Sequence, residues 1–280
     1  MFSGRTDMAI ERHARLKDTL AEGLDIHRES EGDLDISVIT VKGPVARQAC
    51  GKPDGTYITI DLEKRWQSDA GMPSEVASAL SRRLSALLPK EGLILIVGLG
   101  NRTVTPDSLG PLAVEKTIVT RHLMEYASEL FPKMRPVAAV APGVMGQTGI
   151  ETMELVCGVC QKTKPSAVIA IDALAASSLN RLGSSFQLST SGIIPGEGAR
   201  NKRLALDRNT LKIPVIAIGV PTVAELSALT GEKRGSAEPF MVAPADIDVL
   251  VKKSALAIGY GINMAIHGEM SISDMEQLLS

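Results

Sequence analysis

The sequence predicts an α/β protein built on a central, mostly parallel sheet that is flanked by helices. Short, uninterrupted aliphatic runs recur along the chain, at 93–97, 137–140, 168–171 and 214–220. Runs of this kind are typical of parallel strands that are buried on both faces. Segments with helical spacing separate them, as expected of strand–helix–strand units. The first third lacks this alternation and is expected to add a small β-rich element.

The N-terminal third is predicted to begin with a mobile arm. Residues 1–35 are rich in charge, with a helix expected near 9–22. Alternating apolar residues predict strands at 36–41 and 57–62. A helix over 74–88 follows, with Ser74 as the expected N-cap.

The central elements follow in order. The strand at 93–97 is expected to lead into a helix on which Leu112, Val119 and Leu123 share one face. The remaining expectations are a strand at 137–140, a helix at 150–162, a strand at 168–171, an edge strand at 186–189, a last buried strand at 214–220 and an amphipathic helix at 245–267. Residues 230–244 are polar and are predicted to form a mobile insert.

Composition indicates an ordinary globular protein of the cytoplasm. Of the 280 residues, 44% are hydrophobic and 22% are charged, and the net charge of −2 gives no electrostatic reason to expect nucleic acid or a membrane as partner. Aromatic residues make up only 3%, which argues against stacking platforms for bases. No run approaches the length of a membrane span, and the N-terminus lacks the apolar stretch of a signal peptide. Three cysteines do not form a disulfide framework.

Two aspartates stand near the carboxyl ends of predicted strands. Asp107 lies in the loop and turn after 93–97, and Asp172 directly follows 168–171. Because the carboxyl ends of parallel strands line the ligand crevice of an open sheet, the two carboxylates are expected to meet there. The alternative is structural, since either aspartate could cap a following helix. For Asp172 that helix would start at Ala173, and a ribose hydroxyl is a further possible partner.

A shared site would suit these carboxylates for hydrolysis. Two neighbouring carboxylates do not both ionise easily, so one keeps a proton while the other stays charged. The charged group can activate a water, and the protonated group can polarise a peptide carbonyl and later protonate the leaving amine. This chemistry needs neither a metal nor a covalent intermediate.

Other motifs are weaker. Gly98-Leu99-Gly100 begins like a dinucleotide loop, but Thr103 stands where the third glycine belongs. Cys157 and Cys160 have metal-ligand spacing without a second ligand pair, so two core thiols are expected. The histidines are scattered and predict no metal site. The cations of the glycine-rich loop, Arg200, Lys202 and Arg203, could recognise an acidic side chain of a substrate, although a solvated loop is the alternative.

Taken together, longer segments resemble the germination protease of spore-forming bacteria, an atypical aspartic endopeptidase. The segment Gly98-Leu-Gly-Asn-Arg-Thr-Val-Thr-Pro-Asp-Ser-Leu-Gly-Pro111 is similar to that family's first catalytic segment. The further similar segments are 114–123, 141–152, 170–175, 196–203 and 213–222. The similarity begins at Arg5-Thr6-Asp7 and extends to about residue 225.

The resemblance implies a function. Asp107 and Asp172 fall on the family's catalytic aspartates. The expected activity is the degradation of small acid-soluble spore proteins at germination, in the cytoplasm of the forespore and the spore core. The resemblance also implies a homotetramer and a self-processing zymogen cut between Asp7 and Met8. Residues 1–7 would then be a propeptide, and 8–280 would form a single α/β peptidase domain.

The resemblance implies no cofactor and no metal. The family is distantly similar to the hydrogenase-maturation peptidases, which bind a metal near the equivalent crevice, but this sequence offers no histidine there. Two alternative functions remain compatible with the sequence. The first is a metallopeptidase of the hydrogenase-maturation type, whose activity a chelator would abolish. The second is a non-enzymatic nucleotide-binding α/β module, in which both aspartates would be helix caps.

Overall fold

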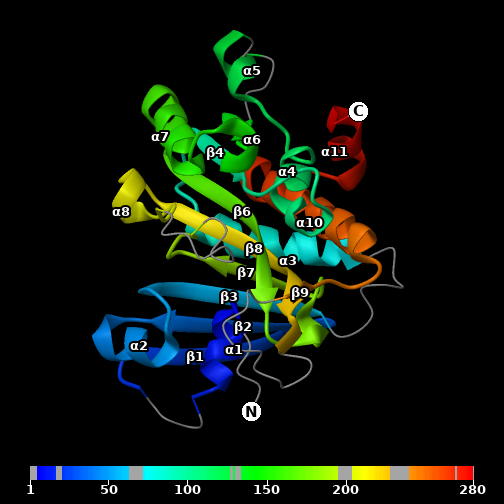
Figure 1. Cartoon of the computed structure of the whole chain (residues 1–280). Coiled ribbons are helices and arrows are strands. Elements are labelled where there is room, and N and C mark those ends of the chain that lie inside the picture. The colour runs from blue at the N-terminus through cyan, green and yellow to red at the C-terminus, as the bar shows by residue number, and fades with distance from the viewer. Residues whose placement is uncertain are drawn as a thin grey trace.

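The computed structural model of the chain describes residues 5–16, 21–62, 72–126, 129, 134–194, 204–227, 240–268 and 270–279. Its centre is one mixed sheet of nine strands in the order β1-β2-β3-β7-β8-β6-β4-β5, with β9 beside β8 (Figure 1). The strands are β1 (Leu24–Glu31), β2 (Leu34–Val41), β3 (Gly55–Leu62), β4 (Ile94–Gly98), β5 (Val137–Val140), β6 (Ala167–Ala176), β7 (Ser185–Ser189), β8 (Val215–Glu225) and β9 (Met241–Val242). The predicted α/β class, a central sheet flanked by helices, is confirmed.

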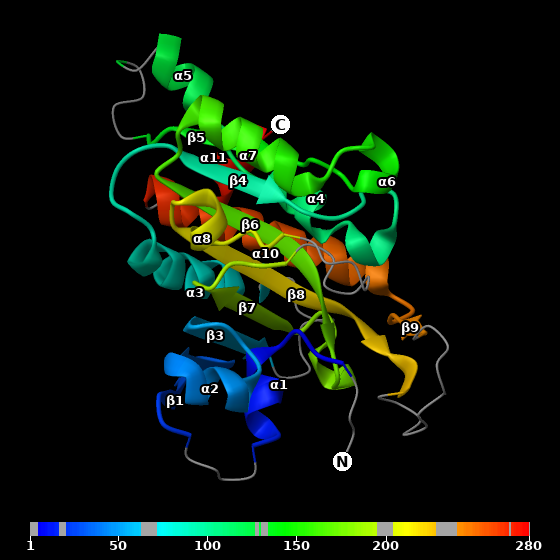
Figure 2. The same ribbon diagram turned by 60° about the vertical axis from the view of Figure 1, so that its left-hand side comes forward.

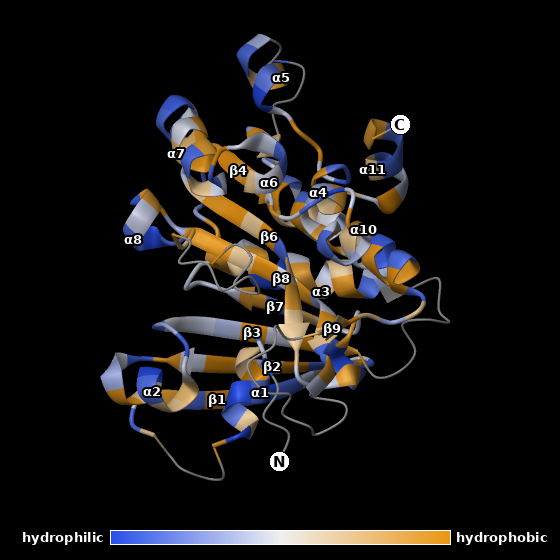
Figure 3. Cartoon of the chain, viewed as in Figure 1, coloured by the Kyte–Doolittle hydropathy of each residue, from blue (hydrophilic) through white to orange (hydrophobic). Residues whose placement is uncertain are grey.

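One half of the sheet is parallel. β4 pairs with β5 and with β6, and β6 pairs with β8, all in parallel register. All five residues of β4 are buried, as are nine of the ten in β6, and Figure 3 shows both strands as mostly hydrophobic. Burial on both faces explains why these strands were visible in the sequence as aliphatic runs.

The other half is antiparallel and is continuous with the first. β1, β2 and β3 form a meander, and β7 joins β3 to β8. The predicted N-terminal β-rich element is therefore part of the central sheet. The prediction of an edge strand at 186–189 was wrong, because β7 lies between two strands and Phe186 and Leu188 are fully buried.

Helices cover both faces of the sheet (Figure 2). α3 (Met72–Leu87), α10 (Ile247–His267) and α4 (Leu109–Val114) pack on one face, in the same apolar cluster as Ile60, Ile96 and Ile218. α7 (Thr152–Thr163) packs on the opposite face of the parallel half. α1 (Ala9–Ala14) and α2 (Gly43–Cys50) cover that face of the antiparallel half. Among the described residues, the remaining helices are α5 (Arg121–Tyr126), α6 (Met145–Thr148), α8 (Arg208–Leu211), α11 (Ile272–Leu279) and the 3-10 turns η2 (Thr105–Asp107) and η4 (Leu179–Arg181).

Several expected boundaries differ. The single helix expected after β4 is divided into α4 and α5, and Val119 between them is exposed. α3 begins at Met72, so Ser74 lies inside the helix and is not its N-cap. Residues 241–242 of the predicted insert form β9, which pairs with the end of β8, while 228–239 lie outside the described residues.

The N-terminal arm is the largest correction. Residues 5–14 are not a mobile arm: Met8 and Ala9 have no exposed surface, and the helix over 9–22 is limited to α1. β1 occupies the end of the same charged region as an edge strand with six exposed residues. In β1 the charged residues therefore belong to an exposed edge strand, whereas Asp7 and Glu11 of the same region are buried.

α10 is a mostly buried helix. It is the one helix among the described ranges that is long and apolar enough to cross a membrane, with a mean hydropathy of 1.3 in its best window. It meets this criterion by length and composition only. Because 67% of that window is buried inside the fold, mainly against α3 and α4, the apolar length serves the core.

Candidate active site

β6 positions Asp172 at the point where the strand loses a neighbour. The last parallel pair between β4 and β6 is Gly98 with Ile171, so Asp172 is the first residue of β6 beyond β4. The strand itself continues to Ala176 along β8. The interpretation of Asp172 as a cap of a helix at 173–176 is therefore wrong. Asp172 is 5% exposed, and its Oδ1 accepts a hydrogen bond of 2.9 Å from the amide of Ala173.

The loop after β4 carries Asp107 back to the same place. The amide of Leu99 donates to the carbonyl of Ile171 at 2.8 Å, which ties the start of the loop to β6. The amide of Asn101 then donates to Oδ2 of Asp107 at 2.7 Å. η2, which ends at Asp107, packs against β6, β8 and α10. The two aspartates are thus held on either side of the short segment 99–101.

Close backbone contact fixes this loop. Gly100 has φ +106°, and a Cβ there would lie 2.1 Å from the carbonyl oxygen of Asp107. A Cβ on Gly110 would lie 2.3 Å from the carbonyl oxygen of Leu99 and 2.6 Å from that of Ile171. Glycine is required where a backbone approaches another this closely. The glycines after β4 therefore serve loop packing.

The helix-cap interpretation of Asp107 is also wrong. α4 begins at Leu109 with Ser108 as its N-cap. The carboxylate of Asp107 instead turns back to the loop and accepts from Asn101. The N-cap position of α4 is thus taken by Ser108 and not by Asp107.

Asn101 links this loop to α6, which sequence reasoning missed. Its Oδ1 accepts from the Thr103 amide at 3.0 Å, from the Thr103 hydroxyl at 2.8 Å and from Nε2 of Gln147 at 2.8 Å. Asn101 directly follows the Gly98-Leu99-Gly100 motif, and this position was the one indication in the sequence that Asn101 belongs to the site. Nothing local pointed to Gln147.

The predicted processing site lies inside the fold. Asp7 is 8% exposed, and Met8 is fully buried. The amide of Asp7 donates to the carbonyl of Ala175 at 2.8 Å, and the amide of Ala175 donates to Oδ2 of Asp7 at the same distance. The guanidinium of Arg5 lies 3.7 Å from the other carboxylate oxygen. β6 therefore holds Asp7 three residues beyond Asp172.

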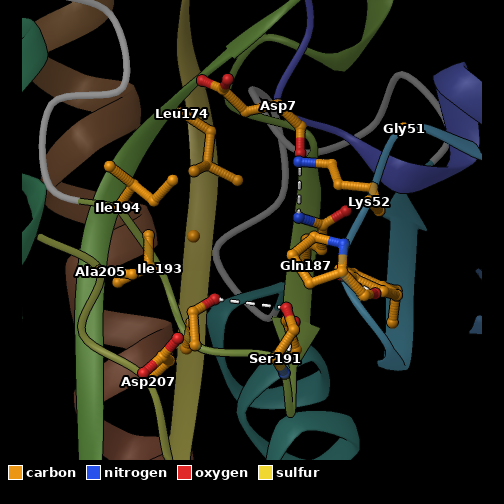
Figure 4. A pocket seen from close by; sticks show the side chains of 16 residues that line it. Asp7, Gly51, Lys52, Leu174, Gln187, Ser191, Ile193, Ile194, Ala205 and Asp207 are labelled. Carbon is orange, nitrogen blue, oxygen red and sulfur yellow. Dashed lines mark hydrogen bonds between the residues drawn. The ribbon is translucent and has the colours of Figure 1, made fainter. Parts of the chain in front are cut away.

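Gln187 of β7 holds the peptide on either side of Met8. Its Nε2 donates to the carbonyl of Asp7 at 3.3 Å (Figure 4). Its Oε1 accepts from the amide of Ala9 at 2.7 Å. The orientation of the amide is dictated by its partners, since a carbonyl only accepts and an amide N–H only donates. No pattern in the sequence pointed to Gln187, because one glutamine in a five-residue strand between two serines is ordinary.

Glu11 anchors the start of α1 to the end of β6. One carboxylate oxygen accepts from the amide and the hydroxyl of Ser177, both at 2.7 Å, and the other accepts from the amide of Ser178 at 2.9 Å. Arg181 lies 3.7 Å away. Glu11 is 7% exposed, so these contacts compensate for burying its charge.

Asp172 and Gln187 share one face of the sheet. Asp172 pairs with Gly219 of β8, and Gly219 pairs with Gln187 of β7, so the three lie in one row. Paired residues on adjacent strands point to the same face. The side chain of Leu174 covers Gly219, because a Cβ there would lie 2.5 Å from it. Leu174 therefore stands between the two polar side chains.

A cleft opens on this face beside Asp7 (Figure 4). Its wall includes Gln187 and Leu174 from the sheet, Lys52 from the segment after α2, and Asp207 from the far side. Arg200, Lys202 and Arg203, the cations predicted to recognise substrate, lie outside the described residues. Lys52 is thus a cation of this cleft that the sequence had not suggested.

The two thiols of α7 are half-buried and lie at the margin of the core, whereas two core thiols were expected. Cys157 and Cys160 are free and pack against the apolar cluster of Val97 and Val168. Burial raises the pKa of Cys160 from 9.0 to about 11, which keeps its thiol protonated. Within the described ranges, no group of three or more histidine, cysteine, aspartate or glutamate side chains is arranged to hold a metal ion.

Comparison with known proteins gives concordant matches over most of the chain. A family model described as germination protease matches residues 4–234. A germination protease of Caldanaerobacter subterraneus subsp. tengcongensis is 39% identical, covering 98% of this chain and 98% of that protein. One of Bacillus cereus (strain AH187) is 43% identical over 82% of this chain and 66% of that protein. A solved NiFe hydrogenase maturation protease, HycI of Thermococcus kodakarensis KOD1, is similar with a TM-score of 0.41 and 20% identity, over 66% of this chain and 98% of that one.

Proposed function

Because the chain belongs to the germination protease family and is thus an endopeptidase of spore germination, we propose that Asp107 and Asp172 are its catalytic pair. The observation that carries the proposal is the loop after β4. Its backbone is bonded to Ile171 on one side and to the Asp107 carboxylate on the other. Only residues 99–101 separate the contact with Ile171 from the contact with Asp107, and this short separation favours a shared site for the two carboxylates.

In this site the two carboxylates take different roles. One is ionised and removes a proton from a water, whose oxygen attacks the peptide carbonyl carbon. The other is protonated and donates a hydrogen bond to the carbonyl oxygen as negative charge develops there. When the C–N bond breaks, the proton taken from water passes to the leaving amine.

The substrates are small acid-soluble spore proteins, and the enzyme is made as a zymogen that removes residues 1–7. Cleavage then falls between Asp7 and Met8, leaving 8–280 as a single peptidase domain. The packing of Asp7 against β6, on the strand that carries Asp172, supports this proposal. The proposal extends to a homotetramer that acts in the cytoplasm of the spore core, with no membrane or nucleic acid as direct partner.

Recognition of an acidic residue before the cut bond is assigned to the loop cations Arg200, Lys202 and Arg203. The test is Lys202→Ala, assayed with matched peptides that carry aspartate or asparagine at that position. A charge contact predicts a selective loss with the aspartate peptide. Equal preference in the wild type and the variant would remove Lys202 from this role.

The catalytic pair is tested with Asp172→Asn and Asp107→Asn, each isosteric with the natural residue. Intact mass is followed over time at mildly acidic pH, with a small acid-soluble spore protein as substrate. Loss of a general acid or base predicts a rate lower by about 10²–10⁴-fold in either variant. Circular dichroism of the variants serves as the control for folding.

Two outcomes would contradict the proposal. Wild-type rates in either folded variant would show that the carboxylate is not catalytic. Loss of wild-type cleavage on addition of a chelator, restored by Zn²⁺, would replace the metal-free pair with a metallopeptidase.

A further inference from the structure

We infer that Gln187 is an inhibitory clamp, which holds the Asp7–Met8 peptide away from the two aspartates and thereby limits the rate of self-processing. This inference rests on the proposed self-processing function. It adds the residue that controls when the bond reaches the catalytic pair.

The first support is the pattern of contacts around the bond. Gln187 donates to the carbonyl of Asp7, the carbonyl of the bond to be cut, and accepts from the amide of Ala9. One side-chain amide therefore contacts the backbone on both sides of Met8, as a neighbouring strand would, and one of its two contacts is to the bond itself. Gln187 is 7% exposed and Met8 is fully buried, so water does not compete easily for these contacts.

The second support is the place of the clamp in the sheet. Gln187 is on β7, and Asp172 is on β6, with Gly219 of β8 between them. Two strand spacings separate their backbones by about 10 Å. Leu174 fills the intervening surface over Gly219. η2, which ends at Asp107, contacts β6, β8 and α10, and β7 is not among the elements that it packs against in the described residues.

The third support is that the flanking contacts hold the same segment from both ends. Upstream, the amide of Arg5 donates to Oε2 of Glu225 at 3.2 Å. Downstream, Glu11 is bonded to Ser177 and Ser178. Between these anchors Asp7 is bonded to Ala175. The bond is thus held at β6 and β7 and must leave Gln187 before it can be hydrolysed at Asp172.

The clamp is first tested without catalysis, in chains that carry Asp172→Asn. Amide hydrogen exchange of the segment 7–10 is compared between Asp172→Asn alone and the double variant with Gln187→Leu. Leucine keeps the size of the side chain and loses both hydrogen bonds. Exchange in the segment is expected to rise by at least about fivefold, because each lost hydrogen bond lowers the cost of opening. The matched control adds Gln277→Leu, at an exposed position on α11, and should leave exchange unchanged.

The rate of self-processing is then measured in chains with Asp172 intact. Gln187→Leu is expected to release residues 1–7 at least about fivefold faster than the wild type. Gln187→Glu keeps an acceptor for Ala9 and loses the donor to Asp7, so an intermediate acceleration is expected. Thermal unfolding identifies any variant whose exchange rises through global loss of stability.

The outcomes separate the clamp from the function on which it rests. Unchanged exchange in the Gln187→Leu chain would overturn the clamp. Faster exchange with slower self-processing would also overturn it and would make Gln187 a residue that positions the bond for cleavage. If the wild type never releases residues 1–7 yet the exchange result stands, self-processing fails and the contact remains a structural one.

Discussion

The loop that carries Asp107 and the segment that carries Asp7 both contact strand β6, but different kinds of contact hold them there. The loop is fixed by backbone packed on backbone, at Gly100 and Gly110, with no room for one additional carbon. The segment is fixed by polar side chains, chiefly Gln187 and Glu11. Steric contacts of the first kind persist while the fold persists, whereas hydrogen bonds of the second kind can be broken by local opening of the segment. Steric contacts are suited to holding a catalytic loop, and hydrogen bonds are suited to holding a segment that must later be removed.

The largest expected effect is in the glycine-packed loop. Gly110→Ala places a methyl group against the backbones of Leu99 and Ile171, so either the loop or β6 must move. We expect the free energy of unfolding to fall by about 3 kcal/mol, together with the loss of most activity. Urea denaturation with a matched assay checks this.

Gly158→Ala is the matched control. Gly158 lies in α7 with no atom within 4 Å of the added methyl, and alanine favours a helix over glycine by about 0.5–1 kcal/mol. The control is therefore expected to stabilise the protein slightly. Wild-type stability and activity for Gly110→Ala would show that the loop is not held by this contact.

The second largest effect is expected from substitution of Glu11, one of the polar side chains that hold the N-terminal segment. Glu11→Gln replaces one carboxylate oxygen with an amide group that faces the donors of Ser177 and Ser178. We expect the free energy of unfolding to fall by about 2 kcal/mol, since a buried donor loses a charged acceptor. Hydrogen exchange in residues 7–12 is expected to rise more than exchange in β4. Glu22→Gln, at an exposed site, is the control. Equal increases in both regions would contradict a separately held segment.

The contrast between the region around the Asp107 loop and the N-terminal segment also explains what could be predicted from the sequence. β4 and the first half of β6 are buried on both faces, so their composition alone marked them. The carboxylates were recognised because they follow such strands. Asp172 nevertheless interrupts an aliphatic run, and the sequence therefore ended the strand there, whereas pairing with β8 carries it on to Ala176.

The N-terminal segment could not be predicted, for a physical reason. Asp7 and Glu11 are charged and stand in a charged region, which is typical of solvated chain. Their partners, Ala175, Ser177 and Gln187, are more than 160 positions away. Long-range hydrogen bonds that compensate buried charge leave no local pattern. The row of Asp172, Gly219 and Gln187 was hidden in the same way, because it exists only in the register of three strands.

The smallest expected effect uses two thiols as reporters of the two regions. Cys50 packs in the apolar cluster of Met8 and Ala9, while Cys160 packs beside β4 and β6. Burial raises the pKa of both thiols, that of Cys160 to about 11, so both stay largely protonated at pH 8. Because the thiolate is the reactive form, alkylation is slow at both positions and quickens with rising pH.

Release of the N-terminal segment should change the alkylation rate of Cys50 but not that of Cys160. Removing residues 1–7, or substituting Gln187→Leu, uncovers the cluster around Cys50 and is expected to raise its alkylation rate by about threefold to tenfold, as local opening becomes easier. Cys160 should react at the wild-type rate, because the packing beside β4 and β6 does not depend on the segment. Peptide mass spectrometry after a short exposure to iodoacetamide measures both sites in one sample. A parallel rise at Cys160 would mean that the two regions open together, and that the segment is part of the same cooperative unit as the catalytic loop.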